Sequence, residues 1–596
     1  MMYITAAFLA FLAGFAAHVQ AVEYTTAHPL SSVVNTPIKD CGKFTELPVP
    51  MLAWLGDMPT IAANGYTETT SPGSIFAKQG LSVKLYRQDS LVKQLEDYIS
   101  CKTPFLRVTN GMMVMAGDVF KSDVQSRLTP TPIYLLTFSK GGDVAVGRAS
   151  IKNPKDMCNT DGSLQVYSPH VDYMATIFRS VGCPIPVDKI HWVKDMIEDT
   201  KDSMYPARAL REDPNIQWVF VISPDATALT SGKGSEGSVD GAHVILSTAT
   251  CDTCIADLYY VRSDWAASNK ETYSKFVHAL LLAQEYSAGL MAAKQPKEVY
   301  DKWITASAKM LLGSADLTAD AEAMWPDGHF AGWNGNVQFF TDSNYPRNFA
   351  NMTREASEAF GPDGLRLIAK PVSLVPAALD YTKLKEGLKK TTFEAPTFDR
   401  QAVQEVIRKR EEQGTLVDDR LFSFDVPFRP NETIFDPNAY TDKLDQMITF
   451  MTTMGGAIYT IEAYADTQQY IRLKCGTVVD ATGVKKLDMN CKSGTGTPAM
   501  LAKIKQTAKD GTLARAIAVR DALAARAGQK GINLNMDKVE VIGHGLMKPN
   551  IPGCKYDKEG DVTPSCYPSS KEQWDAMRHA EFSVISTESS DFVALR

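Results

Sequence analysis

AIYTIEAYAD, residues 457–466, is the stretch that decides the fold of the C-terminal part of the chain. Apolar residues alternate through it, which predicts a β-strand that ends at Asp466. The amphipathic segment YTDKLDQMITFMTTMGG (440–456) precedes it and predicts a helix with Gly455 after its end. Further outward we expect strands in RLFSFDVPF (420–428), KVEVIGHG (538–545) and AEFSVIS (580–586), and a helix in TLARAIAVRDALAARAGQKGI (512–532). This order predicts a small α+β domain over residues 420–596.

The expected helix carries Leu513, Ala516, Val519 and Leu523 on one face, and Arg515 near its start, beside free backbone N–H donors. With the motifs AYAD, TLARAIAVRDAL and IGHG, the domain resembles the OmpA-like peptidoglycan-binding domain over roughly residues 421–585. The resemblance implies that the strand-end acid and the helix arginine hold a diaminopimelate side chain of the wall peptide. A carboxylate and a planar guanidinium suit its ammonium and carboxylate. The residues implied for peptidoglycan binding are Asp466, Arg515, Thr512 and Arg578.

The chain departs from the pattern of that family at three places. Ala508 stands where the family has Asn, and His579 stands where a second Arg is usual. The loop between Asp466 and Arg515 is longer than usual and contains two cysteines. An OmpA-like fold that no longer binds the wall is therefore the alternative.

Residues 47–388 alternate short apolar strands with amphipathic helices, which predicts two doubly wound α/β lobes in series. MMVMAGDVF (112–120) is among the expected strands. The segments WLGDMP (54–59), FAKQGLSVKL (76–85), FSKGGDVAV (138–146), SPHVDYMATIFRSVG (168–182) and RSDWAASNKETYSKFVHALLLAQE (262–285) resemble, in order, periplasmic solute-binding proteins of the nitrate, taurine and sulfonate uptake type. The resemblance implies a clamshell that closes on a small anion.

Backbone N–H groups in glycine-rich turns and at helix starts hold such an anion, and polar side chains complete the site. By position, the candidates are Trp54, Asp57, Gly141, Gly142, Ser168 and His170. Each has a structural alternative: Trp54 as core packing, Asp57 as a turn residue, Ser168 as a helix N-cap and His170 as a solvated or capping histidine.

The segment between the two parts, residues 389–419, is dense in charge. DRQAVQEVIRKREEQG (399–414) predicts a solvated linker helix that ends at Gly414. GKGSEG (232–237) matches a dinucleotide-binding pattern, but an expected strand follows it where that pattern needs a helix, so we interpret it as a surface loop.

The first residues predict secretion. Residues 4–17 are an apolar run, and Val19 and Ala21 fit a cleavage site, which indicates a signal peptide over residues 1–21 and an N-terminal extension over 22–46. An uncleaved membrane anchor is the alternative, but the run is shorter than the roughly 20 residues that span a bilayer.

Ten cysteines fit an oxidising compartment. We expect the pairs Cys475 with Cys491, Cys554 with Cys566, Cys41 with Cys101 and Cys158 with Cys183. Cys251 and Cys254, in CDTC, form a disulfide, a redox motif or half of a zinc site, and the first is favoured because no second pair or redox context is evident.

A formal net charge of −7 argues against nucleic acid as a partner. The chain has no P-loop, HExxH or GxSxG motif, so we expect no enzyme activity, cofactor or metal. The combined prediction is a periplasmic solute-binding protein that is held on peptidoglycan, with the outer membrane as an alternative location, and that serves transport or sensing with an ABC permease or another envelope protein. The alternatives are an enzyme, since the same clamshell occurs in thiamine-related pyrimidine synthesis, and an envelope scaffold whose clamshell docks proteins.

Overall fold

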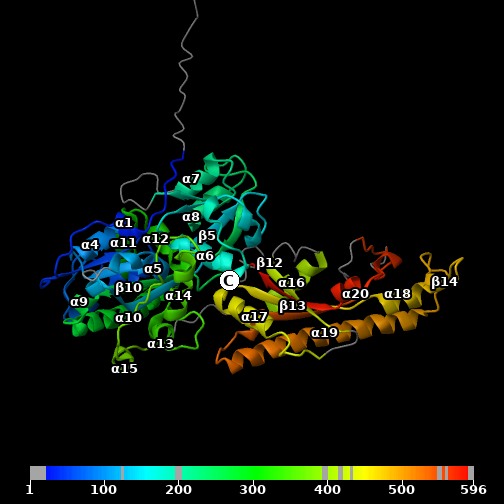
Figure 1. The fold of residues 1–596 in the computed structure, drawn as a ribbon. Coiled ribbons are helices and arrows are strands. Elements are labelled where there is room, and N and C mark those ends of the chain that lie inside the picture. Colours follow the sequence, from blue (N-terminus) through cyan, green and yellow to red (C-terminus); the bar gives the residue numbers. More distant parts are fainter. Residues whose placement is uncertain are drawn as a thin grey trace, which may run out of the picture.

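The computed structural model describes residues 22–121, 126–194, 205–391, 400–413, 420–429, 434–546, 553–557 and 561–587. The expected signal peptide lies outside these residues. Figure 1 shows two α/β lobes beside an elongated C-terminal part. The chain is therefore a mixed α/β protein with several sheets, as the sequence predicted at the level of class.

The first lobe contains a four-stranded sheet in the order β11-β4-β10-β3 and a parallel pair, β1-β2. In this lobe β10 is antiparallel to both β3 and β4. Its strands are β1 (Leu47–Met51), β2 (Val83–Arg87), β3 (Phe105–Thr109), β4 (Pro130–Ser139), β10 (Ala256–Arg262) and β11 (Gly328–Phe330). Its helices are α1 (Leu30–Val33), α2 (Met58–Ala63), α3 (Ile75–Lys78), α4 (Leu91–Ile99), α5 (Asn110–Met115), α9 (Ser263–Ala266), α10 (Lys270–Ala293), α11 (Lys297–Leu312), α12 (Thr318–Ala323), α13 (Gly332–Thr341), α14 (Phe349–Phe360) and α15 (Tyr381–Leu384).

The second lobe is built on a five-stranded sheet in the order β7-β6-β8-β5-β9. Its elements are β5 (Asp143–Gly147), β6 (Gly162–Gln165), α6 (Pro169–Ser180), β7 (Ile190–Val193), α7 (Tyr205–Glu212), β8 (Trp218–Ile222), α8 (Ser223–Thr230) and β9 (His243–Ser247). The chain passes between the sheets of the two lobes at residues 140–142, after β4, and again at 248–255, before β10. We call these the first and second crossing segments.

One expected strand is wrong. Residues 112–120 belong to α5 and a 3-10 turn, and the Thr109 hydroxyl caps α5 by accepting from the Met112 N–H at 3.2 Å. Met112 to Met115 are all buried, so the segment has no polar face. An apolar run without a polar face does not distinguish a buried helix from a buried strand.

The C-terminal part contains a four-stranded sheet in the order β12-β17-β13-β16. In it β13 is parallel to β16 and antiparallel to β17, which also pairs with β12. The elements are α16 (Arg400–Gln413), β12 (Arg420–Pro427), α17 (Thr441–Thr453), β13 (Ile458–Tyr464), α18 (Gln468–Cys475), β14 (Thr477–Val479), β15 (Lys485–Leu487), α19 (Pro498–Gln529), β16 (Val539–Gly545), α20 (Lys571–Met577) and β17 (His579–Ile585).

Helices cover this sheet on both faces. Ala516, Val519 and Leu523 of α19 are buried in the same cluster as Tyr459 of β13, whereas Leu513, expected on this face, is 39% exposed. The backbones of α19 and β16 touch at Gly543, where a Cβ atom would lie 2.6 Å from the Leu513 nitrogen. Only glycine allows this approach, which accounts for the first glycine of IGHG.

The helix α16 is not the solvated linker that its charge predicted. Val403 and Ile407 are buried against Ile458 and Ile585 of the C-terminal sheet. The side-chain amide of Gln404 also donates to Glu540 at 2.8 Å. A stripe of two apolar residues is enough to dock an otherwise charged helix.

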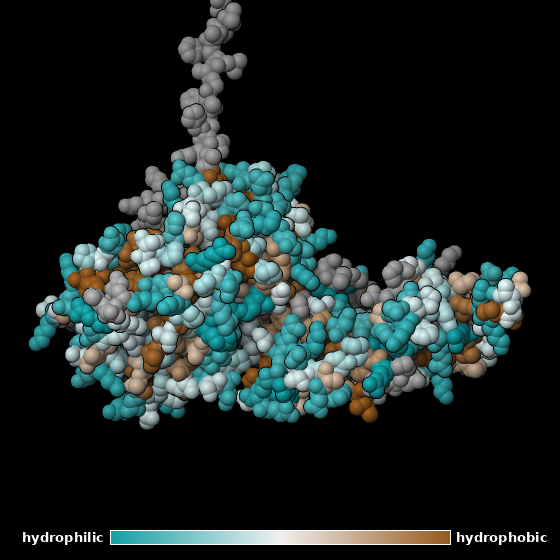
Figure 2. Space-filling view, in the orientation of Figure 1, coloured by the Kyte–Doolittle hydropathy of each residue, from teal (hydrophilic) through white to brown (hydrophobic). Residues whose placement is uncertain are grey.

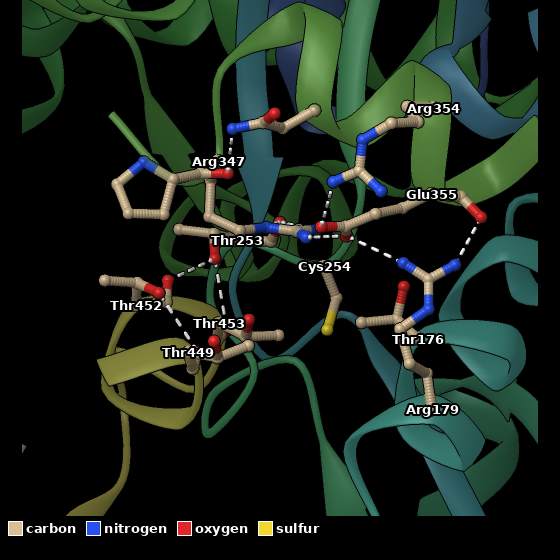
Figure 3. Close-up of polar contacts among 12 residues, drawn as sticks. Thr176, Arg179, Thr253, Cys254, Arg347, Arg354, Glu355, Thr449, Thr452 and Thr453 are labelled. Atoms are coloured by element: carbon tan, nitrogen blue, oxygen red, sulfur yellow. Dashed lines mark hydrogen bonds and ion pairs between the residues drawn. The ribbon is translucent and has the colours of Figure 1, made fainter. Parts of the chain in front are cut away.

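The second crossing segment is joined to the C-terminal part (Figure 3). The Thr253 hydroxyl donates to the carbonyls of Thr452 and Thr453 at 3.1 Å, and Arg347 of the first lobe donates to the Thr253 carbonyl at 3.1 Å. Glu355 ties Arg347 to Arg179 of the second lobe, at 2.8 and 3.0 Å. All three parts of the molecule therefore meet at this segment.

All ten cysteines are paired in the structure, and the pairs expected from the sequence are confirmed. They are Cys41–Cys101, Cys158–Cys183, Cys251–Cys254, Cys475–Cys491 and Cys554–Cys566. CDTC is thus a disulfide within the second crossing segment. Within the described ranges, no helix has the length and apolar character needed to cross a membrane.

Candidate binding sites

A cavity of about 1360 Å³ lies at the end of β13, between α18, α19, α20 and the segment that joins β12 to α17. Its lining combines acidic, basic and aromatic side chains. Its lining includes Phe428, Arg429, Phe435, Asp436, Tyr440, Asp466, Gln468, Gln469, Tyr470, Lys503, Thr507, Ala508, Thr512, Arg515, Lys571, Trp574, Asp575 and Arg578. The four residues that the sequence proposed for peptidoglycan binding all line this one cavity.

Asp466 follows β13 directly and leaves part of its carboxylate open to the cavity. One oxygen accepts from the Gln468 N–H at 3.2 Å, and the other lies 3.7 Å from Nη1 of Arg578. The side chain of Asp466 is 25% exposed. It can therefore accept a further hydrogen bond from a ligand.

Arg578 lies between α20 and β17, and it is buried. Its Nη2 donates to Asp575 at 2.9 Å. Its Nε is buried and has no hydrogen-bond partner among the residues that the structure describes. A buried donor without a partner carries a free-energy cost.

Arg515 lies in the interior of its helix, not near its start. The helix α19 begins at Pro498, where the Thr497 hydroxyl caps it by accepting from the Met500 N–H at 3.3 Å. The backbone N–H groups beside Arg515 are therefore used within the helix, and the prediction that they are free to bind a ligand is wrong. Its Nη1 donates to the Tyr464 carbonyl at 2.9 Å, and its guanidinium lies 5.4 Å from the ring centre of Phe428.

Thr512 links helix to strand. Its hydroxyl donates to the Lys509 carbonyl at 2.9 Å and accepts from the Gly545 N–H at 3.0 Å. Because both bonds are to the backbone, Thr512 shapes the wall of the cavity more than it serves a ligand.

A buried ionic network behind the cavity was missed by the sequence reasoning. Glu462 of β13 bonds to Nε2 of His544 at 2.8 Å and to Nη2 of Arg420 at 2.6 Å. Burial alone would raise the pKa of Glu462, but His544 and Arg420 lower it to about 2. The ring of Tyr464 is stacked between His544 and His579, at 4.6 and 4.7 Å. Alternation in AIYTIEAYAD places Glu462 on one face of the sheet but does not reveal its partners.

The long insertion forms one wall of the cavity. Gln468, Gln469 and Tyr470 of α18 line it, together with Lys503 and Thr507 from the early part of α19. The site is therefore larger than a clamp made of Asp466 and Arg515 alone.

Four of the six candidate residues of the two lobes lie at or beside the first crossing segment: Trp54, Gly141, Gly142 and His170. The indole of Trp54 lies on Gly142, where a Cβ atom would be 2.2 Å from the ring. The Gly141 N–H donates to the hydroxyl of Thr248 at 2.8 Å, and His170 bonds to Asp143 at 2.8 Å. Trp54 therefore fills the junction at this point.

Asp57 lies inside the first lobe rather than on an open surface. It is fully buried and accepts from Nε of Arg107 at 2.9 Å and from the Tyr259 hydroxyl at 3.0 Å. Arg107 also pairs with Asp257 at 2.8 Å. Burial raises the pKa of Asp57 to about 6, even though Arg107 opposes this.

Ser168 is also buried, and its hydroxyl donates to the Gln165 carbonyl at 2.8 Å instead of capping α6.

Carboxylates surround the junction between the lobes. The Ser223 hydroxyl donates to Asp327 at 3.3 Å, and burial raises the pKa of Asp327 to about 6. Burial also raises the pKa of Asp225, near His170, to about 6. An anionic solute, as the resemblance implies, would meet Asp143, Asp225 and Asp327 here, so the electrostatics of the junction do not favour an anion.

Within the described residues, no group of three or more His, Cys, Asp or Glu side chains is placed to hold a metal ion.

No protein-family model and no curated protein matches the chain. Among solved structures, it is similar to the periplasmic aliphatic sulphonate binding protein SsuA of Escherichia coli, with 14% identity, a TM-score of 0.38, and coverage of 60% of this chain and 98% of that one. It is also similar to the ligand-binding component of an ABC-type import system from Staphylococcus aureus with zinc bound, with 11% identity, a TM-score of 0.38, and coverage of 58% and 100%.

A third similar structure is an enzyme, the desulfurization enzyme DSZB, with 11% identity, a TM-score of 0.34, and coverage of 57% of this chain and 98% of that one. These scores and identities are too low to establish a shared fold or a function.

Proposed function

We propose that the chain is a periplasmic envelope protein whose C-terminal cavity binds the peptide stem of peptidoglycan and whose two lobes take up a small solute. The observation that carries the wall-binding part is the convergence of Asp466, Arg515 and Arg578 on one cavity. Asp466 and Arg578 lie more than 100 positions apart in the sequence, and the fold brings them, with Arg515, to the same cavity.

The chemistry of the cavity suits a zwitterionic side chain. An ammonium group would bind the partly open carboxylate of Asp466, and a carboxylate would bind the guanidinium groups of Arg515 and Arg578. Small-molecule pockets measure about 300–1,000 Å³. The cavity, at about 1360 Å³, has room for neighbouring residues of a peptide stem as well.

Sedimentation with purified, lipid-free peptidoglycan tests this part. Loss of one charge-assisted hydrogen bond costs about 1.5–3 kcal/mol, so we expect Asp466→Ala to weaken binding by about 10- to 150-fold. Arg515→Ala should weaken it as well, but Arg515 also holds the Tyr464 carbonyl, so its unfolding must be measured in parallel.

Two variants on the outer face of the same helix serve as matched controls. Arg520→Ala and Asp521→Ala remove a charge from α19 outside the cavity. Both should sediment with the wall as the unmodified protein does. Equal sedimentation of Asp466→Ala and the unmodified protein would mean that the cavity does not bind the wall through this carboxylate.

The solute-binding part is supported by the two lobes and the two crossing segments between them, which is an arrangement that can close on a ligand. Mass spectrometry of small molecules that co-purify with the protein would identify the solute, and thermal stabilisation by that compound would support binding. We place the protein in the periplasm, where an ABC permease or another envelope protein would be its partner, and we propose no catalytic role.

A scaffold role is the second candidate, and the packing of Trp54 on Gly142 favours it, because the indole occupies the junction where a solute would lie. Absence of stabilisation by any compound in a broad panel, together with capture of a defined envelope protein that is lost in a variant of the lobe surface, would support the scaffold role.

A further inference from the structure

An arm projects from the C-terminal sheet, and its base forms one wall of the cavity (Figure 1). We define the arm as residues 467–511, which include α18, the hairpin β14–β15 and the first part of α19. Within α19, which is described throughout, the fully buried side chains begin at Thr512. The first 14 residues of α19 therefore extend away from the sheet and carry the hairpin with them.

Large apolar side chains are exposed on this arm. Five of the 14 exposed large hydrophobic residues of the described chain fall within residues 478–500, so exposed apolar side chains are concentrated on the arm. Val479 and Met489 are each 63% exposed, and Val484 is 53% exposed. The others are Val478 and Met500. Figure 2 shows hydrophobic atoms gathered at this end of the molecule.

The arm is also basic. It contains eight Lys and Arg residues and three Asp residues, a net charge of +5 in a chain whose net charge is −7. Lys485 and Lys486 of β15 lie directly opposite Val479 and Val478 of β14. Lys486 is paired with Asp480 at 2.8 Å, and Lys474 and Lys505 pair with aspartates outside the arm, so Lys485 is the lysine that places positive charge beside Val479.

The exposure is built into a braced structure. The Cys475–Cys491 disulfide closes the base of the hairpin. Asp488 accepts from the N–H groups of Lys492 and Ser493 at 2.9 Å. Gly476 lies so close to the Ser493 carbonyl oxygen that a Cβ atom would be 2.0 Å from it. These contacts hold the hairpin in one conformation. The exposed valines are therefore part of an ordered surface.

We propose that the tip of this arm, Val478, Val479, Val484 and Met489, inserts into the interfacial region of an anionic lipid bilayer. Exposed apolar side chains on a basic arm suit an anionic membrane surface, where burial of the valines and attraction of the lysines to lipid headgroups act together. A second copy of the chain fits less well, because pairing of two β15 edges would bring Lys485 and Lys486 of each copy together.

Flotation of the full-length protein with vesicles tests the proposal. Vesicles of phosphatidylcholine with about one third phosphatidylglycerol carry the anionic charge that the arm requires, and pure phosphatidylcholine vesicles are the uncharged comparison. We expect binding to the anionic vesicles that weakens as salt is added. The double variant Val479→Asp, Val484→Asp should bind at least about tenfold more weakly, and Lys485→Gln about fivefold more weakly.

Val375→Asp is the matched control, since Val375 is 74% exposed and lies outside the arm. It should float as the unmodified protein does. Failure of the folded protein to float with anionic vesicles, or equal flotation of the Val479→Asp, Val484→Asp variant, would overturn the proposal. Self-association in sedimentation velocity that this variant abolishes would also overturn it and identify a second copy as the occupant.

The proposal is independent of wall binding. The residues changed in these variants do not line the cavity. We therefore expect the double variant to sediment normally with lipid-free peptidoglycan, and Asp466→Ala to float normally with vesicles.

Discussion

Gly142→Ala provides a direct test of how the two lobes meet. Gly142 lies in the first crossing segment, and a Cβ atom there would be 2.2 Å from Cη2 of Trp54 and 2.6 Å from Cζ3. Its backbone φ is not in the left-handed region, so alanine causes no backbone strain. The indole must move instead, and such overpacking costs about 1–3 kcal/mol. The lower entropy of the unfolded chain offsets about 0.4–1 kcal/mol of this.

A double-mutant cycle separates the ring from other causes. In the Trp54→Leu background the atoms that would clash with the new methyl group are gone, so Gly142→Ala should be neutral or slightly stabilising. The coupling energy should therefore be about 1–3 kcal/mol. Urea unfolding, followed by far-UV circular dichroism, gives the four free energies.

Gly289→Ala is the control for the substitution itself. Gly289 is inside α10, and nothing lies within 4 Å of the position that its Cβ would take. Alanine should stabilise there by about 0.5–1 kcal/mol. An equal loss of stability for Gly142→Ala with and without the indole would refute the contact between Trp54 and Gly142 as its cause.

The remaining predictions concern pH and the domain contact. Burial raises the pKa of Asp57 to about 6 and that of Asp172 to about 7, so the folded protein takes up protons before the unfolded chain does, and the urea midpoint should rise as the pH falls from 7 to 5. Below about pH 4.3, the usual pKa of Glu, stability should fall because the pKa of Glu462 is lower in the folded protein than in the unfolded chain. A urea midpoint that falls steadily from pH 7 to 5 would contradict the expected rise. In Gly456→Ala, a Cβ atom would lie 1.7 Å from a carbonyl oxygen of the second crossing segment, so we expect faster proteolysis between the lobes and the C-terminal sheet. Gly528→Ala is the control, since its Cβ has open space, and it should be cut at the rate of the unmodified protein.

Much of the fold could be predicted from the sequence where one face of an element is polar and the other apolar. The amphipathic segment 440–456 is the helix α17, in which Leu444, Met447 and Ile448 are buried. The strand before Asp466 was also predicted, although all of its residues are buried, and the five disulfides agree with the structure. Prediction failed where that contrast was missing. The helix α5 is buried all round, and α19 extends through a polar insertion whose only start signals are Thr497 and Pro498.

The candidate sites were predictable only in part. Asp466 and Arg515 could be related to each other through a resemblance in pattern, and both line the cavity. The role of Asp57 could not be predicted in the same way, because its partners Arg107 and Tyr259 lie 50 and 202 positions away in the chain. Sequence spacing does not reveal an ion pair that only tertiary packing creates. The same holds for Trp54, whose neighbour Gly142 is brought to it by the first crossing segment.

The second crossing segment links the angle between the lobes to the position of the C-terminal sheet. Any rotation of one lobe against the other must displace residues 248–255, since this segment joins their sheets. The same segment accepts the Gly456 N–H at the Thr250 carbonyl at 3.0 Å and donates from Thr253 to the end of α17. The Cys251–Cys254 disulfide leaves it little freedom to absorb a rotation internally. If the lobes bind a solute and the cavity binds the wall, as proposed above, movement of this segment on binding would couple the two sites, and by linkage each ligand would change the affinity for the other by the same factor.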